Sequence, residues 1–119
     1  MQRIPIGLAV IASVFIAQSS MACDTLDFEV KGLKWSQSDG RFDIIFVLVN
    51  NCDQAAAAEV QVVAFDADGS PIAEAQGWPK SISNLAPGEG FVTSAFGDLL
   101  DWRPGVEKIA VNVIRARTW

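Results

Sequence analysis

The chain has 119 residues, of which 50% are hydrophobic and 19% charged, a composition that argues against intrinsic disorder. It contains no histidine, which excludes Ser-His-Asp and Cys-His catalytic sites and histidine-ligated metals. The formal net charge is −5, and no cluster of lysine or arginine offsets it, so the composition disfavours binding to nucleic acid or anionic lipid.

Residues 1–22 have the pattern of a secretory signal peptide. Arg3 supplies a positive charge, residues 4–17 form a short apolar stretch, and small residues precede a cut before Cys23. The apolar stretch is short for a membrane span of ~20 residues, so we expect cleavage and no retained anchor. Residues 23–119 are then a single domain, periplasmic or secreted.

The two cysteines both lie in the exported part of the chain. An even count in an exported protein predicts an intramolecular disulfide between Cys23 and Cys52. The rival interpretation makes Cys23 the lipidated first residue of a lipoprotein. Ser20 stands where such signals usually carry leucine, and lipidation would leave Cys52 without a partner. Two cysteines alone are too few for structural zinc, and we expect no metal and no cofactor.

Seven short segments read as strands, separated by turn signals about every ten residues. They cover residues 26–30 (continuing to 35), 42–49, 60–65, 71–76, 80–83, 91–96 and 106–115. This spacing predicts an all-β fold, a seven-stranded antiparallel β-sandwich of the immunoglobulin or fibronectin-III type. The alternation changes phase at Gly32, which predicts a β-bulge there.

The first two strands suggest a hairpin register. Pairing their apolar faces sets Phe28 opposite Leu48. In that register Cys23 and Cys52 are one residue out of step, but Cys23 begins the exported chain and is free to adjust. We therefore expect the disulfide to join the start of the domain to the end of the second strand. A ring of this size contributes on the order of 3–4 kcal/mol.

Three stretches have a recognisable character: Asn50-Asn51, a strand over residues 60–69 that ends in Phe65-Asp66 and an Asp-Gly turn, and a Leu-Ala-Pro-Gly-Glu turn within residues 82–89. Together they resemble the FxLYD-type domains of bacterial envelope proteins. The resemblance implies a sandwich fold in an extracytoplasmic module without established chemistry.

Two groups of carboxylates invite a catalytic or metal-binding interpretation. Asp66 and Asp68 begin like a calcium loop, but the twelfth position is Gly77 rather than a bidentate glutamate, so a plain turn is favoured. Asp98 and Asp101 could be read as the paired carboxylates of a glycosidase. Capping and solubility explain them better, because so short a chain leaves little room for a cleft. We expect no catalytic residue and no enzyme.

Two loop tryptophans are more informative. Trp78 and Trp102 lie beside proline or glycine, and such residues serve either as binding anchors or as plugs at the ends of a sandwich. Leu99 and Leu100 make the second loop unusually apolar. We take these four residues as possible partner contacts, and we expect Trp102 to be mostly buried and one of the two leucines to be exposed.

Two functions from different classes remain open. The first is an exported, non-enzymatic module that binds a protein partner, or assists its assembly as a chaperone, through loops or an open sheet edge. The second is a small hydrolase or a carbohydrate-binding domain that uses the loop tryptophans. A flat surface with an unpaired edge favours the first, and a polar pocket with convergent carboxylates favours the second. The sequence names no partner.

Overall fold

The structure is a computed structural model that describes residues 22–119. The predicted signal peptide lies outside the described residues, apart from Ala22. The described strands are β2 (Phe28–Ser38), β3 (Arg41–Asn50), β4 (Ala57–Phe65), β5 (Pro71–Gly77), β6 (Gly90–Thr93) and β7 (Lys108–Arg117). Two short helical segments accompany them, η1 (Thr25–Asp27) and α2 (Phe96–Leu99).

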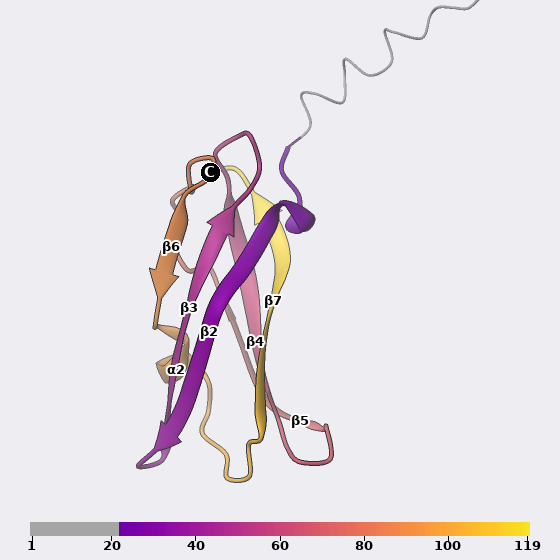
Figure 1. The fold of residues 1–119 in the computed structure, drawn as a ribbon, viewed down its shortest axis with the longest axis vertical. Coiled ribbons are helices and arrows are strands. Elements are labelled where there is room, and N and C mark those ends of the chain that lie inside the picture. Colours follow the sequence, from indigo (N-terminus) through magenta and orange to yellow (C-terminus); the bar gives the residue numbers. More distant parts are fainter. Residues whose placement is uncertain (1–21) are drawn as a thin grey trace, which may run out of the picture.

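The strands form two antiparallel three-stranded sheets, β2–β3–β6 and β5–β4–β7, packed as two layers (Figure 1). Alternate side chains of both sheets point inward and make one core, since successive residues of a strand face opposite sides. The largest fully buried side chains are Phe42, Phe46, Leu48, Val60, Val62, Leu85 and Phe96, with Asn50 as the polar member. The all-β prediction is confirmed.

The predicted strand over residues 80–83 is wrong, and the described residues form six strands rather than seven. This segment forms turns, with Ser81 at a φ of 60°. The connection between β5 and β6 crosses from one sheet to the other, and Leu85, which follows the turns, forms an isolated bridge with Ala56. The ammonium of Lys80 also binds the carbonyl oxygen of Asn84, which holds the turn closed.

The predicted hairpin register is also wrong, by two residues. Phe28 lies opposite Asn50, and Leu48 lies opposite Val30. A slip of two residues keeps every side chain on its own face, so alternation alone does not distinguish the two registers. The predicted bulge is confirmed: the pairing shifts between Lys31 and Lys34, and Gly32 adopts a φ of 64° that favours glycine.

The Cys23–Cys52 disulfide is present, with 5.9 Å between the two Cα atoms. Cys23 reaches Cys52 because η1 turns the chain before β2 begins. A capping box stabilises that turn: Asp24 accepts the N–H of Leu26, and Asp27 accepts the N–H of Asp24. The Cys23 sulfur in this bond is not available for a thioether to lipid.

The strand predicted over residues 91–96 is shorter than expected. β6 ends at Thr93, and the chain turns into α2, which packs against the half of β3 that β6 does not reach. The ring of Phe96 lies 5.7 Å from that of Phe46. Gly97 sits so close to β3 that a Cβ built on it would overlap the carbonyl oxygen of Phe42.

Candidate interaction surface

The outward face of the β2–β3–β6 sheet carries a row of apolar side chains. Ile45, Val47 and Val49 of β3 share this face with Val92 of β6, as the pairing of Val47 with Val92 requires. Ile45 is 42% exposed and Val92 is 59% exposed, while the other two are half-buried. We call these four residues the outer stripe.

Gly90 explains why the outer stripe is uncovered beside β6. It pairs with Val49 and has no side chain to place over its neighbours. A Cβ at this position would lie 3.1 Å from Cγ1 of Val47 and 3.7 Å from Cγ2 of Val49. The two valines therefore reach the open edge of the sheet.

The outward face of the other sheet is different, because its polar groups bind one another. The Gln61 amide donates to the Glu74 carboxylate at 2.7 Å, and Arg115 pairs with Glu59 at 3.5 Å. The ammonium of Lys108 lies over the ring of its apolar neighbour Phe65, 5.6 Å from the centroid. The two faces are thus unequal: Ile45 and Val92, the strand residues among the exposed large hydrophobic side chains, both lie on the β2–β3–β6 face.

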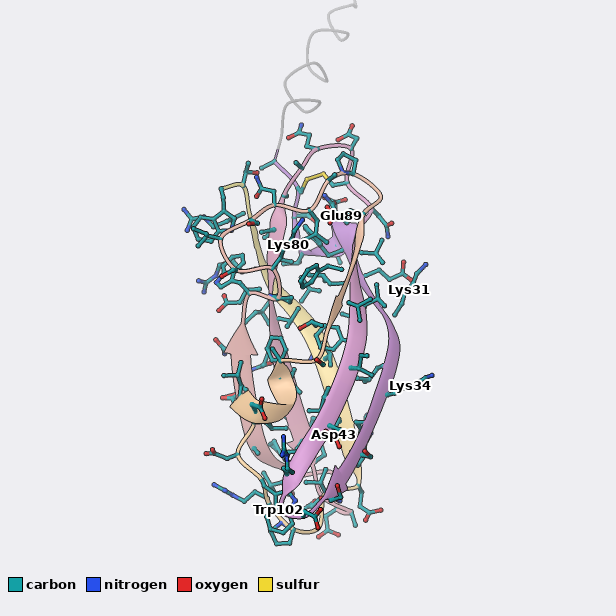
Figure 2. The ribbon with its side chains drawn as sticks, turned by 90° about the vertical axis from the view of Figure 1, so that its left-hand side faces the viewer. Lys31, Lys34, Asp43, Lys80, Glu89 and Trp102 are labelled. Atoms are coloured by element: carbon teal, nitrogen blue, oxygen red, sulfur yellow. A yellow bond between two sulfur atoms is a disulfide. The ribbon has the colours of Figure 1, made fainter. Side chains whose placement is uncertain are left out.

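A shallow hollow of about 510 Å³ continues the outer stripe towards the β2–β3 turn. Ile45 belongs to both features, and the charged residues of the hollow are Lys34, Arg41, Asp43 and Asp98. Arg41 and Asp98 face each other at 3.6 Å. Figure 2 shows Lys34 pointing outward on this side of the molecule. The hollow offers charges of both signs rather than convergent carboxylates.

The four predicted contact residues do not form one surface. Leu100 is 3% exposed and belongs to the core, whereas Leu99 is 54% exposed, so one leucine of the pair is exposed as expected. Trp102 keeps 39% of its surface exposed, more than predicted, and lies at one end of the sandwich (Figure 2). Trp78 lies close in sequence to Lys80, which Figure 2 places near the other end.

Trp78 packs instead on the last residue of the chain. Its ring meets that of Trp119 edge-on, with 5.6 Å between centroids, and the guanidinium of Arg117 lies 4.1 Å from the Trp119 centroid. Asn84 holds the Trp119 backbone through a hydrogen bond of 3.0 Å to its N–H. A joint sugar-binding platform of Trp78 and Trp102 finds no support in this arrangement.

The remaining candidates from the sequence are accounted for by local structure. Asp66 accepts the N–H groups of Asp68 and Ser70, so its carboxylate closes the turn that it begins. Cys23, Asp27 and Cys52 lie within 4.8 Å of one another, a grouping that would suit a metal ion. Both sulfurs, however, belong to the disulfide and are not thiolates.

A polar cluster fixes the loops at the start of β6. The buried Asn50 amide donates to the carbonyl oxygens of Gln54 and Leu85, both at 2.9 Å. Glu89 accepts the Ala86 N–H at 2.8 Å and binds Lys80 at 2.9 Å. The Ala86 hydrogen bond, followed by that from Lys80, holds the pKa of Glu89 below its ordinary value.

Sequence reasoning did not single out the outer stripe, although residues 42–49 showed a signal for it. That segment is apolar on both faces, which is typical of a central strand, and β3 is the central strand of its sheet. In a three-stranded sheet packed on one side only, such a strand leaves its second apolar face in solvent.

The chain has no match among protein-family models, curated proteins or solved structures. Within residues 22–119, no helix is long and apolar enough to cross a membrane.

Proposed function

We propose that this chain is an exported, non-enzymatic module that binds a protein partner through the outer stripe. The observation that carries the proposal is the solvent exposure of Ile45 and Val92 on a sheet face that they share with the half-buried Val47 and Val49. Contiguous apolar surface on a small domain is characteristic of an interaction site.

The surroundings of the stripe favour a protein over other ligands. Lys31 and Glu29 lie on β2 beside it, and the hollow adds charges of both signs. An apolar centre with a mixed polar rim is the usual anatomy of a protein–protein interface. A nucleic acid or an anionic membrane would need a basic surface, whereas the chain has an acidic excess.

The compartment belongs to the same proposal. The disulfide supports an oxidising environment, in the periplasm or outside the cell, as does the signal-like start of the sequence. The resemblance to FxLYD-type envelope domains points the same way.

We propose further that the topology is immunoglobulin-like. The sheet orders β2–β3–β6 and β5–β4–β7 correspond to strands A–B–E and C′–C–F of that fold, if β2 is taken as strand A. On this assignment strands D and G have no counterpart among the described residues, and strand D would run between β5 and β6, where residues 80–83 form turns.

A charge substitution in the stripe tests the proposed function. Ile45→Glu places a carboxylate opposite Lys34 on the paired strand, so we expect little change in melting temperature and loss of partner capture. The readout is crosslinking and quantitative mass spectrometry of proteins captured from the extracytoplasmic fraction of the cells that produce this chain. Asn112→Glu is the matched control, because Asn112 is exposed on β7 in the other sheet. Equal capture by both variants would contradict the proposal.

A further inference from the structure

The edge of β6 that faces away from β3 has no strand beside it. Residues 80–83 form turns, and further along the same connection Leu85 forms an isolated bridge with Ala56, next to β4 of the opposite sheet. Among the strands of residues 22–119, only β3 pairs with β6. Figure 1 shows β6 at the margin of its sheet with no strand outside it.

The pairing of β6 with β3 determines which backbone groups point outward. Asn50 donates its N–H to the Glu89 carbonyl oxygen at 3.0 Å, and its own carbonyl oxygen accepts the N–H of Gly88 at 2.7 Å, so both backbone groups of Asn50 bond towards the β6 side. Hydrogen-bonded and non-hydrogen-bonded pairs alternate along an antiparallel ladder. Phe91 therefore bonds to β3, while Gly90 and Val92 direct their N–H and C=O groups away from it. No backbone partner for those groups occurs within the described part of the chain.

The other three edge strands carry features that discourage further pairing. β2 has a bulge between Lys31 and Lys34, β5 begins with Pro71, and β7 has Arg115 beside an irregularity in its ladder. Bulges, prolines and charges are the usual protection of an exposed edge. β6, with the sequence Gly-Phe-Val-Thr, has none of these features and is protected only by its shortness.

We propose that β6 pairs antiparallel with β6 of a second copy of this chain, about a two-fold axis at Phe91. Gly90 of each copy then lies opposite Val92 of the other, which uses all four outward-facing backbone groups of each strand. A two-fold axis at Gly90 or at Val92 would pair that residue with its own counterpart and would shorten the overlap of the two β6 strands. Such an interface is isologous and closes on itself, as is usual for a homodimer.

The side chains agree with this register. On the outer face, Val92 of one copy lies over Gly90 of the other, where Val47 reaches the edge because glycine does not cover it. On the inner face, the half-buried Phe91 meets its counterpart across the axis in a non-hydrogen-bonded pair. Aromatic cross-strand pairs of this kind stabilise sheets.

Charge does not oppose pairing of β6 with a second copy of this chain. The chain is acidic and repels itself unless the contact is uncharged, and Gly90–Thr93 carries no charge. The nearest carboxylate in sequence, Glu89, is neutralised by Lys80. An antiparallel arrangement places the two Glu89 residues at opposite ends of the interface, where they do not meet.

Sedimentation equilibrium of the chain purified after export tests the dimer. We expect a concentration-dependent dimer for the wild type and for Val92→Thr, and at least a tenfold higher dissociation constant for Val92→Pro. Proline removes an outward N–H and no ladder bond to β3, so the fold should persist, as near-ultraviolet circular dichroism would verify. Threonine retains the N–H and serves as the matched control. A monomeric wild type, or a Val92→Pro dimer of unchanged strength, would overturn the proposal.

A crosslink tests the register. Phe91→Cys brings two sulfurs to a pair whose Cα atoms are about 4.5 Å apart, within the range of a disulfide. We expect a covalent dimer on mild oxidation. Ser94→Cys is the control and should give none, because it lies opposite residue 88 of the other copy. A dimer that Phe91→Cys does not crosslink would overturn this register.

The dimer goes beyond the proposed function, and either proposal can fail while the other holds. It would join two β2–β3–β6 sheets into one six-stranded sheet with both outer stripes on the same face. A monomeric wild type would leave the capture experiment with Ile45→Glu unaffected, since Ile45 lies on β3 and away from the edge. If the Ile45→Glu variant remained dimeric but lost partner capture, the outer stripe and the β6 edge would be distinct interaction surfaces.

Discussion

Asn50 and Asn51 are neighbours with opposite roles. Asn50 is fully buried at the end of β3, and its side chain joins two loops through hydrogen bonds to Gln54, Leu85 and the N–H of Cys52. Asn51 is exposed and makes one side-chain contact of 3.2 Å, to Glu29. The same residue type is thus structural at one position and peripheral at the next.

Asn50→Ala should lower the free energy of unfolding by about 2–4 kcal/mol, because it leaves buried carbonyl and N–H groups without partners. Asn51→Ala is the matched control and should change it by no more than about 0.5 kcal/mol. Urea unfolding followed by tryptophan fluorescence measures both. Similar values for the two variants would contradict the role given to Asn50.

Glu89 makes the stability of the β6 loop depend on pH. Its pKa lies below the ordinary value because the ionised carboxylate accepts the Ala86 N–H and binds Lys80. A lowered pKa in the folded state means that this stabilisation is present above the ordinary pKa and is lost as the pH falls through the folded value.

We expect Glu89→Gln to melt at a lower temperature than the wild type at neutral pH, and the difference to shrink as the pH falls below the ordinary pKa of a glutamate. Thermal melts across this range provide the measurement. Asp101→Asn, which removes an exposed carboxylate, serves as the control, and its melting temperature should differ little from that of the wild type at neutral or at acidic pH. A melting-temperature difference between Glu89→Gln and the wild type that grows in acid would refute the lowered pKa of Glu89.

At the scale of elements, α2 covers the part of β3 that a longer β6 would otherwise pair with. β6 pairs with Phe46–Val49 only, and the remaining edge of β3 is covered by the turn that carries Gly97. This close approach of backbone to backbone requires a residue without a side chain.

Gly97→Ala should therefore destabilise the fold by about 2–3 kcal/mol, since either α2 or β3 must move to admit the methyl group. Asp98→Ala, the exposed next residue, should change stability by less than about 0.5 kcal/mol, because its ion pair with Arg41 lies in solvent. Chemical unfolding of both variants distinguishes them. A neutral Gly97→Ala would show that the packing of α2 on β3 is loose.

For the whole molecule, the disulfide closes a loop with a sequence separation of 29 residues, which contains all of β2 and β3. It ties η1 to the end of β3 at the start of the domain. In so small a fold, a covalent link across the first hairpin is a large part of the total stability.

Replacing Cys23 and Cys52 together by serine should lower the free energy of unfolding by about 3–4 kcal/mol. A thiol reductant should lower the wild type to the same level and leave the serine variant unchanged. Intact mass of the wild type should show the loss of two hydrogens. A mass increase from acyl chains on Cys23 would contradict the disulfide and support the lipoprotein.

The sequence alone was sufficient for the features that depend on neighbouring residues. Apolar segments bounded by turn signals predicted the strands around Phe42, Val60 and Pro71, the change of phase at Gly32 predicted the bulge, and the cysteine count predicted the disulfide. These features follow from side-chain period, turn chemistry and redox compartment, which are local or compositional.

Only the tertiary structure decided what depends on distant contacts. The register of Phe28 differed by two residues because a slip of two preserves the alternation of faces. Residues 80–83 form turns because Lys80, Asn84 and Leu85 find partners outside any ladder. Leu99 and Leu100 look alike in sequence, yet one is exposed and the other buried. The outer stripe and the open β6 edge arise in the same way, since exposure depends on which strands lie beside a residue, and that is a property of the packed sheets.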